Sequence, residues 1–236
     1  MKITYWSDYS CPYCWIGETR LKKALAQIPE LADVEIEMKS FQLDPSAGEH
    51  AAGDTVTRFA KKYGLSMEDA AARIASISEL GKAEGLDFRY ATTLFTNTMD
   101  AHRLTKKASR DGGQALADQV SEQLFAAYFS DNLELADHEV LVRAAAACGM
   151  DRDEVRRFLA TDEFRAEVLA DEREAAVHGC HAVPCFLIGK YMIPGALDTE
   201  EMRSVLVRVM AEEAAAQMKS LDDMTGAACG PDGCHF

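Results

Sequence analysis

The chain has 236 residues and a formal net charge of −14, from 25 basic and 39 acidic side chains. Its length suits one large domain or a domain with a sizeable insertion. The acidic balance would repel phosphate backbones, so we expect no nucleic-acid partner. No apolar run approaches the roughly 18 residues that span a bilayer, so no membrane partner is expected. The first residues contain no apolar signal core, which favours a cytoplasmic protein.

The N-terminal quarter of the chain predicts a strand, a helix and a second strand. Residues 2–6 form the first strand, a helical apolar spacing starts near residue 15, and residues 34–43 alternate between apolar and polar side chains. Two strands joined by a helix normally make a right-handed parallel crossover. A turn at residues 44–48 then ends this unit.

The rest of the chain predicts a helical block, a hairpin and a final helix. Residues 55–177 show only helical spacing, and the predicted N-caps of these helices are Ser66, Asp137 and Asp151. A hairpin turns at Gly189-Lys190, and Asp198 and Glu201 have capping-box spacing before the last long helix.

This order of elements is the thioredoxin layout with helices inserted between its two halves. We therefore predict an α/β fold in which residues 1–54 and 178–215 form a thioredoxin-like domain. Residues 55–177 are predicted to form a helical insertion domain. Residues 216–236 are predicted to be a C-terminal tail.

Cys11-Pro12-Tyr13-Cys14 lies where the first strand gives way to the first helix. Seven cysteines in a cytoplasmic protein favour redox catalysis or metal binding over structural disulfides. Unpaired amides at a helix N-terminus stabilise a thiolate, so Cys11 is the expected nucleophile and Cys14 the resolving thiol. Half of a zinc site is the alternative, but zinc knuckles usually lie on turns between strands. The position of the motif favours redox chemistry.

Val183-Pro184 precedes the predicted hairpin and is the second signal. A cis X–Pro bond there would turn the backbone of Val183 so that it can pair with an extended substrate peptide. An X-Pro pair alone is weak evidence, but its place at the start of the hairpin strengthens it.

Three segments together resemble the DsbA family, and most of all its cytoplasmic FrnE-like branch: residues 11–17, 97–103 and 179–186. The resemblance implies a thioredoxin fold with a helical insertion, a cis peptide at Val183-Pro184, and disulfide exchange or isomerisation. It implies catalytic roles for Cys11, Cys14 and Pro184, and substrate contacts for Pro12, Tyr13 and Val183. The implied partners are cysteine-containing protein substrates and a thiol electron donor, with no cofactor and no metal.

The chain departs from the family pattern near both signals. Cys185 stands where the family more often has a small residue other than cysteine, and Ala182 stands near a usual glycine. The dipeptide Pro12-Tyr13 resembles that of glutaredoxins. We therefore expect a reduction potential of roughly −200 to −230 mV rather than the roughly −120 mV of DsbA.

The remaining cysteines and histidines leave several interpretations open. Cys229 and Cys234 form either an auxiliary redox pair or a loop staple or metal site with His235. Cys180 and Cys185 could form a disulfide or, with nearby histidines, a zinc site, but ordinary packing is favoured.

Asp8 and Trp6 could line the mouth of the motif, although packing is favoured for Trp6. Asn97 and His102 lie where the insertion should approach the site and could bind a small substrate, but a capped or core role is favoured for His102. Cys148 is interpreted as a buried small hydrophobic residue.

The leading interpretation is a cytoplasmic thiol–disulfide oxidoreductase or isomerase. The first alternative is a glutathione-dependent isomerase or transferase acting on a small organic substrate. Such enzymes lack a resolving cysteine, and the presence of Cys14 weighs against this class. The second alternative is a redox- or zinc-sensing binding protein.

Overall fold

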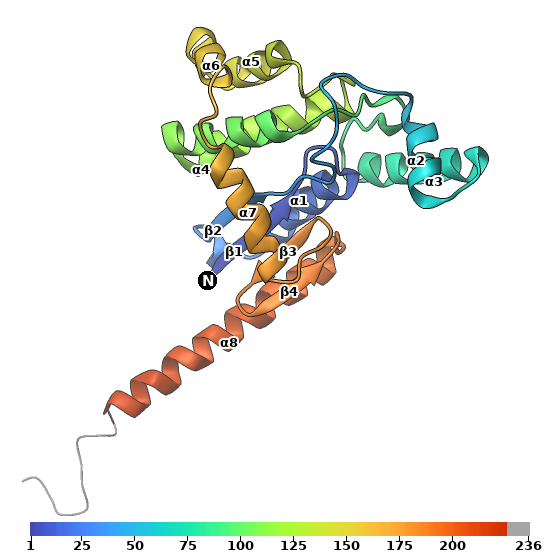
Figure 1. The fold of residues 1–236 in the computed structure, drawn as a ribbon. Coiled ribbons are helices and arrows are strands. Elements are labelled where there is room, and N and C mark those ends of the chain that lie inside the picture. Colours follow the sequence, from blue (N-terminus) through green and yellow to red (C-terminus); the bar gives the residue numbers. More distant parts are fainter. Residues whose placement is uncertain (226–236) are drawn as a thin grey trace, which may run out of the picture.

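A computed structural model describes residues 1–225 and shows a four-stranded sheet with eight helices in that range (Figure 1). The strand order is β2-β1-β3-β4. The central strand β1 (Lys2–Ser7) pairs in parallel with β2 (Glu35–Ser40) and antiparallel with β3 (Cys185–Ile188). The edge strand β4 (Tyr191–Pro194) completes the predicted hairpin with β3. The predicted α/β thioredoxin fold is confirmed.

Helices cover both faces of this sheet. The ranges are α1 (Pro12–Leu25), α2 (Thr55–Tyr63), α3 (Met67–Ala83), α4 (Met99–Phe129), α5 (His138–Ala147), α6 (Arg152–Leu159), α7 (Arg165–Val177) and α8 (Thr199–Thr225). On one face, Ile3 of β1 packs with Leu21 of α1 and Leu206 of α8. On the other face, Trp6 of β1 packs with Ala175 of α7. Alternate side chains of β1 therefore serve two different cores, as the period of a strand requires.

The predicted helix starts are confirmed by their side-chain caps. The Oγ of Ser66 accepts the Asp69 amide at 3.0 Å, and Asp151 accepts the Glu154 amide at 2.8 Å. Asp198 and Glu201 form a reciprocal capping box, with distances of 2.8 and 3.1 Å. Each cap satisfies amide groups that the first turn of a helix leaves without partners.

Three predicted element ends were wrong. β2 ends at Ser40 rather than residue 43, because the amides of Gln42 and Leu43 donate to the side chains of Glu172 and Asp8 instead of to a neighbouring strand. β3 begins at Cys185 rather than residue 183. α8 runs to Thr225, into the predicted tail 216–236, because residues 211–225 are mostly good helix formers and contain neither Gly nor Pro.

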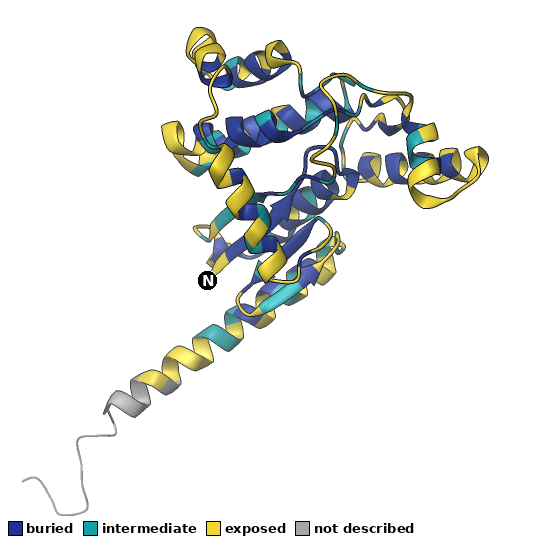
Figure 2. Ribbon diagram, viewed as in Figure 1, coloured by how far each residue is buried: buried dark blue, intermediate teal, exposed yellow. Residues whose placement is uncertain are grey.

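The helical residues between β2 and β3 share a core with the first helix of the thioredoxin half. Trp15 of α1 stacks on Phe125 of α4, with ring centres 5.9 Å apart and planes 4° apart. Phe129 and Phe88 also stack on Trp15. The division into domains remains a prediction, but α1 is packed directly against residues from the helical block (Figure 2).

Residues 214–218 of α8 are exposed, and this part of the helix extends away from the sheet (Figure 2). Within residues 1–225, none of the helices combines the length and apolar character needed to cross a membrane.

Candidate active site

Cys11 is the N-cap residue of α1, and Pro12 is its first helical residue. The Cys11 amide donates to the Asp8 carbonyl at 3.0 Å, and the Cys14 amide donates to the Cys11 carbonyl at 3.1 Å. No side chain caps α1. Cys11 therefore stands at the positive end of the helix, and no side-chain cap takes its place there.

Cys14 lies one turn further along α1 and is more deeply enclosed. Its exposed fraction is 1%, against 3% for Cys11, and both thiols are free in this structure. Burial raises the pKa of the Cys14 thiol well above its ordinary value, and the neighbouring Cys11 raises it further. Cys14 therefore holds its proton until Cys11 has reacted, which suits a resolving thiol.

The peptide bond between Val183 and Pro184 is cis, as predicted. The Cys11 thiol donates to the Val183 carbonyl at 3.3 Å, across 172 positions of sequence. On its other side, the Pro184 carbonyl accepts the Gly195 amide at 2.8 Å. The structure thus brings together four of the predicted residues, two from α1 and two from the loop before β3.

Pro12 and Tyr13 lie beside Cys11 and line a groove of about 730 Å³. The groove is bounded by α2 and α3 and by the loops after β2 and before β3. Six aromatic side chains line it: Tyr13, Phe41, Phe59, Tyr63, Tyr90 and Phe95. This groove could not be found from the sequence, because its residues come from six separate segments and carry no common motif.

Asp8 and His102 form a buried pair behind the cysteine loop. The His102 Nε2 atom lies 3.5 Å from Asp8 Oδ1, and both side chains are fully buried. The Asp8 carboxylate also accepts the Ser10 hydroxyl at 2.9 Å and the Leu43 amide at 2.8 Å. Burial alone would raise the pKa of Asp8, but His102, Leu43 and Ser10 together hold it below its ordinary value. His102 is thus a core histidine, and Asp8 organises the loop.

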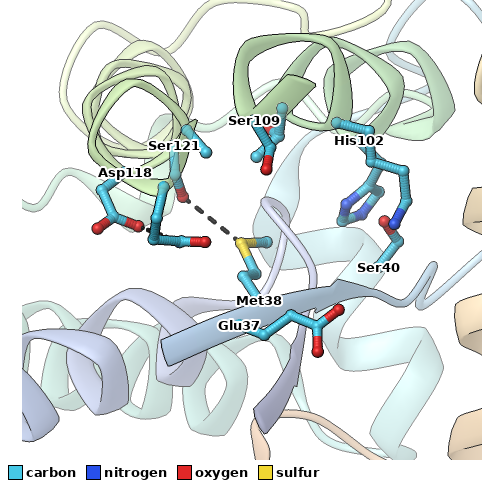
Figure 3. A pocket seen from close by; sticks show the side chains of 11 residues that line it. Glu37, Met38, Ser40, His102, Ser109, Asp118 and Ser121 are labelled. Atoms are coloured by element: carbon cyan, nitrogen blue, oxygen red, sulfur yellow. Dashed lines mark hydrogen bonds between the residues drawn. The ribbon is translucent and has the colours of Figure 1, made fainter. Parts of the chain in front are cut away.

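His102 also borders a small hollow of about 90 Å³ between β2 and α4 (Figure 3). Met38 lies at its floor and accepts the Ser121 hydroxyl at 3.7 Å. No cysteine lines this hollow. It therefore lies apart from Cys11 and Cys14.

Cys180 and Cys185 are joined by a disulfide, with Cα atoms 6.4 Å apart. The favoured interpretation, ordinary packing with side chains that do not converge, was wrong. The physical reason is that the strand starts only at Cys185, so the residues before it form a loop that brings the two sulfurs together. The bond uses the two thiolates that the alternative zinc site would need. Nearby, His178 packs on Trp6 with ring centres 5.5 Å apart.

Other candidates have structural surroundings or lie outside the described residues. Trp6 is buried and its indole N–H donates to the Asp171 carbonyl at 3.0 Å. The Asn97 side chain accepts the Met99 amide at 2.8 Å at the start of α4. Cys148 ends α5 and is partly buried. Cys229 and Cys234 lie outside the described residues, so their auxiliary role stays a prediction.

The sheet, the cysteine pair at a helix start and the facing cis-proline loop define a thioredoxin-fold protein with a dithiol site. Residues 2–207 match the family described as the DSBA-like thioredoxin domain. The chain therefore belongs to the DsbA-like family of thiol–disulfide oxidoreductases.

Solved structures that are similar to the chain include the following three. A probable DsbA oxidoreductase, SCO1869 of Streptomyces coelicolor, is 32% identical, with a TM-score of 0.83 over 100% of this chain and 99% of the other. A 2-hydroxychromene-2-carboxylate isomerase is 15% identical, with a TM-score of 0.65 over 92% and 99%. The cytosolic disulfide reductase DsbM of Pseudomonas aeruginosa, solved with GSH, is 14% identical, with a TM-score of 0.60 over 89% and 100%. The last two likenesses show the fold alone.

Proposed function

We propose that the protein is a cytoplasmic thiol–disulfide oxidoreductase or isomerase that acts on protein disulfides through Cys11 and Cys14. The observation that carries this proposal is the hydrogen bond from the Cys11 thiol to the Val183 carbonyl, above a buried Cys14. It supports a site where the backbone that pairs with the substrate lies beside the attacking sulfur of Cys11. The assignment to the FrnE-like branch is part of this proposal.

The exchange runs in two balanced steps. The Cys11 thiolate attacks one sulfur of a substrate disulfide, forms a mixed disulfide and releases the other sulfur as a thiolate. Cys14 then loses its proton and attacks the Cys11 sulfur, so the substrate leaves reduced and the enzyme holds a Cys11–Cys14 disulfide. A thiol donor returns the enzyme to the dithiol form. The GSH bound to the similar DsbM supports a low-molecular-weight thiol in this role, and its description as cytosolic supports the location.

Insulin reduction and the refolding of scrambled ribonuclease test the proposal. We expect Cys11→Ser to abolish activity in both assays and Cys14→Ser to accumulate a mixed disulfide that mass spectrometry detects. Cys148→Ser is the matched control, since Cys148 is also a free cysteine but lies at the end of α5. Full activity of Cys11→Ser would overturn the proposal.

A glutathione-dependent isomerase acting on a small organic substrate is the second candidate. The groove of about 730 Å³ beside Cys11 supports it, because it offers room for a small ligand at the reactive sulfur. Such a reaction needs no resolving thiol. It therefore requires Cys14→Ser to keep full turnover, whereas the oxidoreductase proposal requires that variant to stall.

A further inference from the structure

The groove beside Cys11 has a basic wall in an acidic protein. Arg58 and Lys62 of α2 and Arg73 of α3 line it, and no Asp or Glu does. Among the described residues, none of these three side chains forms an ion pair, although the chain has 39 acidic and 25 basic residues. Most other basic side chains near the sheet and in α4 do have acidic partners, as Lys39 and Lys107 illustrate. The positive charge of this wall is therefore free to act on a ligand.

Arg58 is the most constrained of the three basic residues. Its guanidinium carbon lies 3.5 Å from the centre of the Phe95 ring, and its buried Nε has no hydrogen-bond partner within the described part of the chain. A planar guanidinium held against a ring presents its N–H groups in a fixed direction. A carboxylate is the group that best fills such a donor set.

The rim of the same groove is apolar and exposed. Tyr13, Tyr63 and Leu65 are exposed by 38%, 56% and 37%, and all three line the groove. Large apolar side chains gathered around a reactive residue mark a contact surface for another molecule. Glutathione has no apolar side chain that would cover them. An extended protein segment would cover the rings and place carboxylates on the basic wall.

We infer that this groove selects protein substrates whose target cysteine is flanked by apolar and acidic residues. The inference rests on the proposed function for the exchange step, but the selection is a binding property of the resting protein. Complementary charge chooses the segment, the aromatic rings hold it, and the backbone of Val183 aligns its cysteine with Cys11. The long-range charge of the chain opposes such acidic partners, so the local wall must supply the attraction.

Calorimetry with unlabelled peptides tests the selection without any chemistry. The probes are two ten-residue peptides with Ser in place of the central Cys, the same Phe and Leu residues, and either Glu or Gln at the flanking positions. The test variant is Arg58→Gln/Lys62→Gln/Arg73→Gln. The charge-matched control is Lys61→Gln/Arg152→Gln/Arg157→Gln, because these residues are exposed and none of them lines the groove.

We expect wild type and the control variant to prefer the Glu peptide, and the test variant to bind it about tenfold more weakly. A tenfold change is about 1.4 kcal/mol of binding free energy, which three weak charge pairs can supply together. Affinity for the Gln peptide should stay unchanged, which also shows that the test variant is folded. An equal loss in both variants, or no preference in wild type, would overturn the inference. Displacement of the Glu peptide by glutathione at equal concentration would overturn it too, because the groove would then be a small-thiol site.

A failure of the proposed function can be told apart from a failure of this inference. Cys11→Ser should keep the preference for the Glu peptide while losing disulfide reduction. If wild type shows the preference but does not reduce a disulfide-linked version of the Glu peptide, the groove assignment stands and the oxidoreductase proposal falls.

Discussion

The disulfide between Cys180 and Cys185 closes the loop that carries Val183 and Pro184. A crosslink stabilises a fold mainly by removing conformations from the unfolded chain. For a closed loop of about six residues, the chain-entropy relation gives about 7 cal/mol/K, or about 2 kcal/mol at 25 °C. The sequence separation of 5 sets this loop size. We therefore expect reduction of this bond to cost about 2 kcal/mol of unfolding free energy.

Urea unfolding with and without dithiothreitol measures this cost in wild type and in Cys180→Ala/Cys185→Ala. Alanine is chosen because both cysteines are buried, and a serine hydroxyl there would add its own penalty. With a slope of about 2–3 kcal/mol/M, the reductant should lower the wild-type midpoint by roughly 0.7–1 M. The variant should not show this part of the shift.

The difference between the two reductant effects isolates the crosslink. Any contribution from Cys11–Cys14 or Cys229–Cys234 is present in both proteins and cancels, as does the packing change caused by alanine. The reasoning is refuted if dithiothreitol shifts both proteins equally. A loss of disulfide-exchange activity in the variant, at unchanged folding, would show in addition that the closed loop holds Val183 in place for substrate.

Three further outcomes are expected. In Gly17→Ala the new Cβ would lie 3.2 Å from Pro184 Cγ and Ala196 Cβ, so the loop must move by a few tenths of an ångström. We expect this to cost about 1 kcal/mol of unfolding free energy and to lower Tm by roughly 2–4 °C, which differential scanning calorimetry measures. A glutathione redox titration of Cys11–Cys14 should give roughly −200 to −230 mV, and a value near −120 mV would contradict the glutaredoxin-like assignment. Because the folded-state pKa of Asp8 is lowered, its carboxylate stabilises the fold above the ordinary carboxyl pKa, and this stabilisation is lost as pH falls through the folded-state pKa. The difference in unfolding free energy between wild type and Asp8→Asn should therefore be full at pH 7 and disappear in strong acid.

The position of Cys11 and Cys14 at the start of α1 could be predicted because its evidence is local. A strand, a Cys-Pro-Tyr-Cys turn and an amphipathic helix follow one another within 25 residues, and each has its own periodicity. The facing Val183-Pro184 is 172 positions away from Cys11, yet it was placed correctly because it opens a recognisable hairpin. Motif order together with topology thus brought the four residues to one site.

The Cys180–Cys185 bond was missed because the path of a loop cannot be traced from its sequence. A strand that starts at residue 185 after a cis proline leaves the direction of residue 180 open, and the prediction took the two side chains not to converge. The strand does start at Cys185. The loop before it nevertheless brings the two sulfurs together.

The groove could not be predicted for a different reason. Arg58 and Lys62 lie on α2 and Arg73 lies on α3, and basic residues on a helix usually make a solvated face. Only the packing of α3 against α1, and of α2 against α3, turns that face toward Cys11. No pattern within one segment encodes this arrangement, since it depends on how three helices meet.

Asp8 shows how the helical block controls the cysteine pair. Its backbone carbonyl holds the Cys11 amide, while its carboxylate contacts His102 of α4 and the Leu43 amide that follows β2. A displacement of α4 would therefore reach the start of α1 through one buried side chain. α2 and α3 of the same block line the groove. The residues between the two thioredoxin halves therefore contact the site in two places, at Asp8 and along the groove. They fix the position of the nucleophile, and by our inference they choose the segment that it attacks.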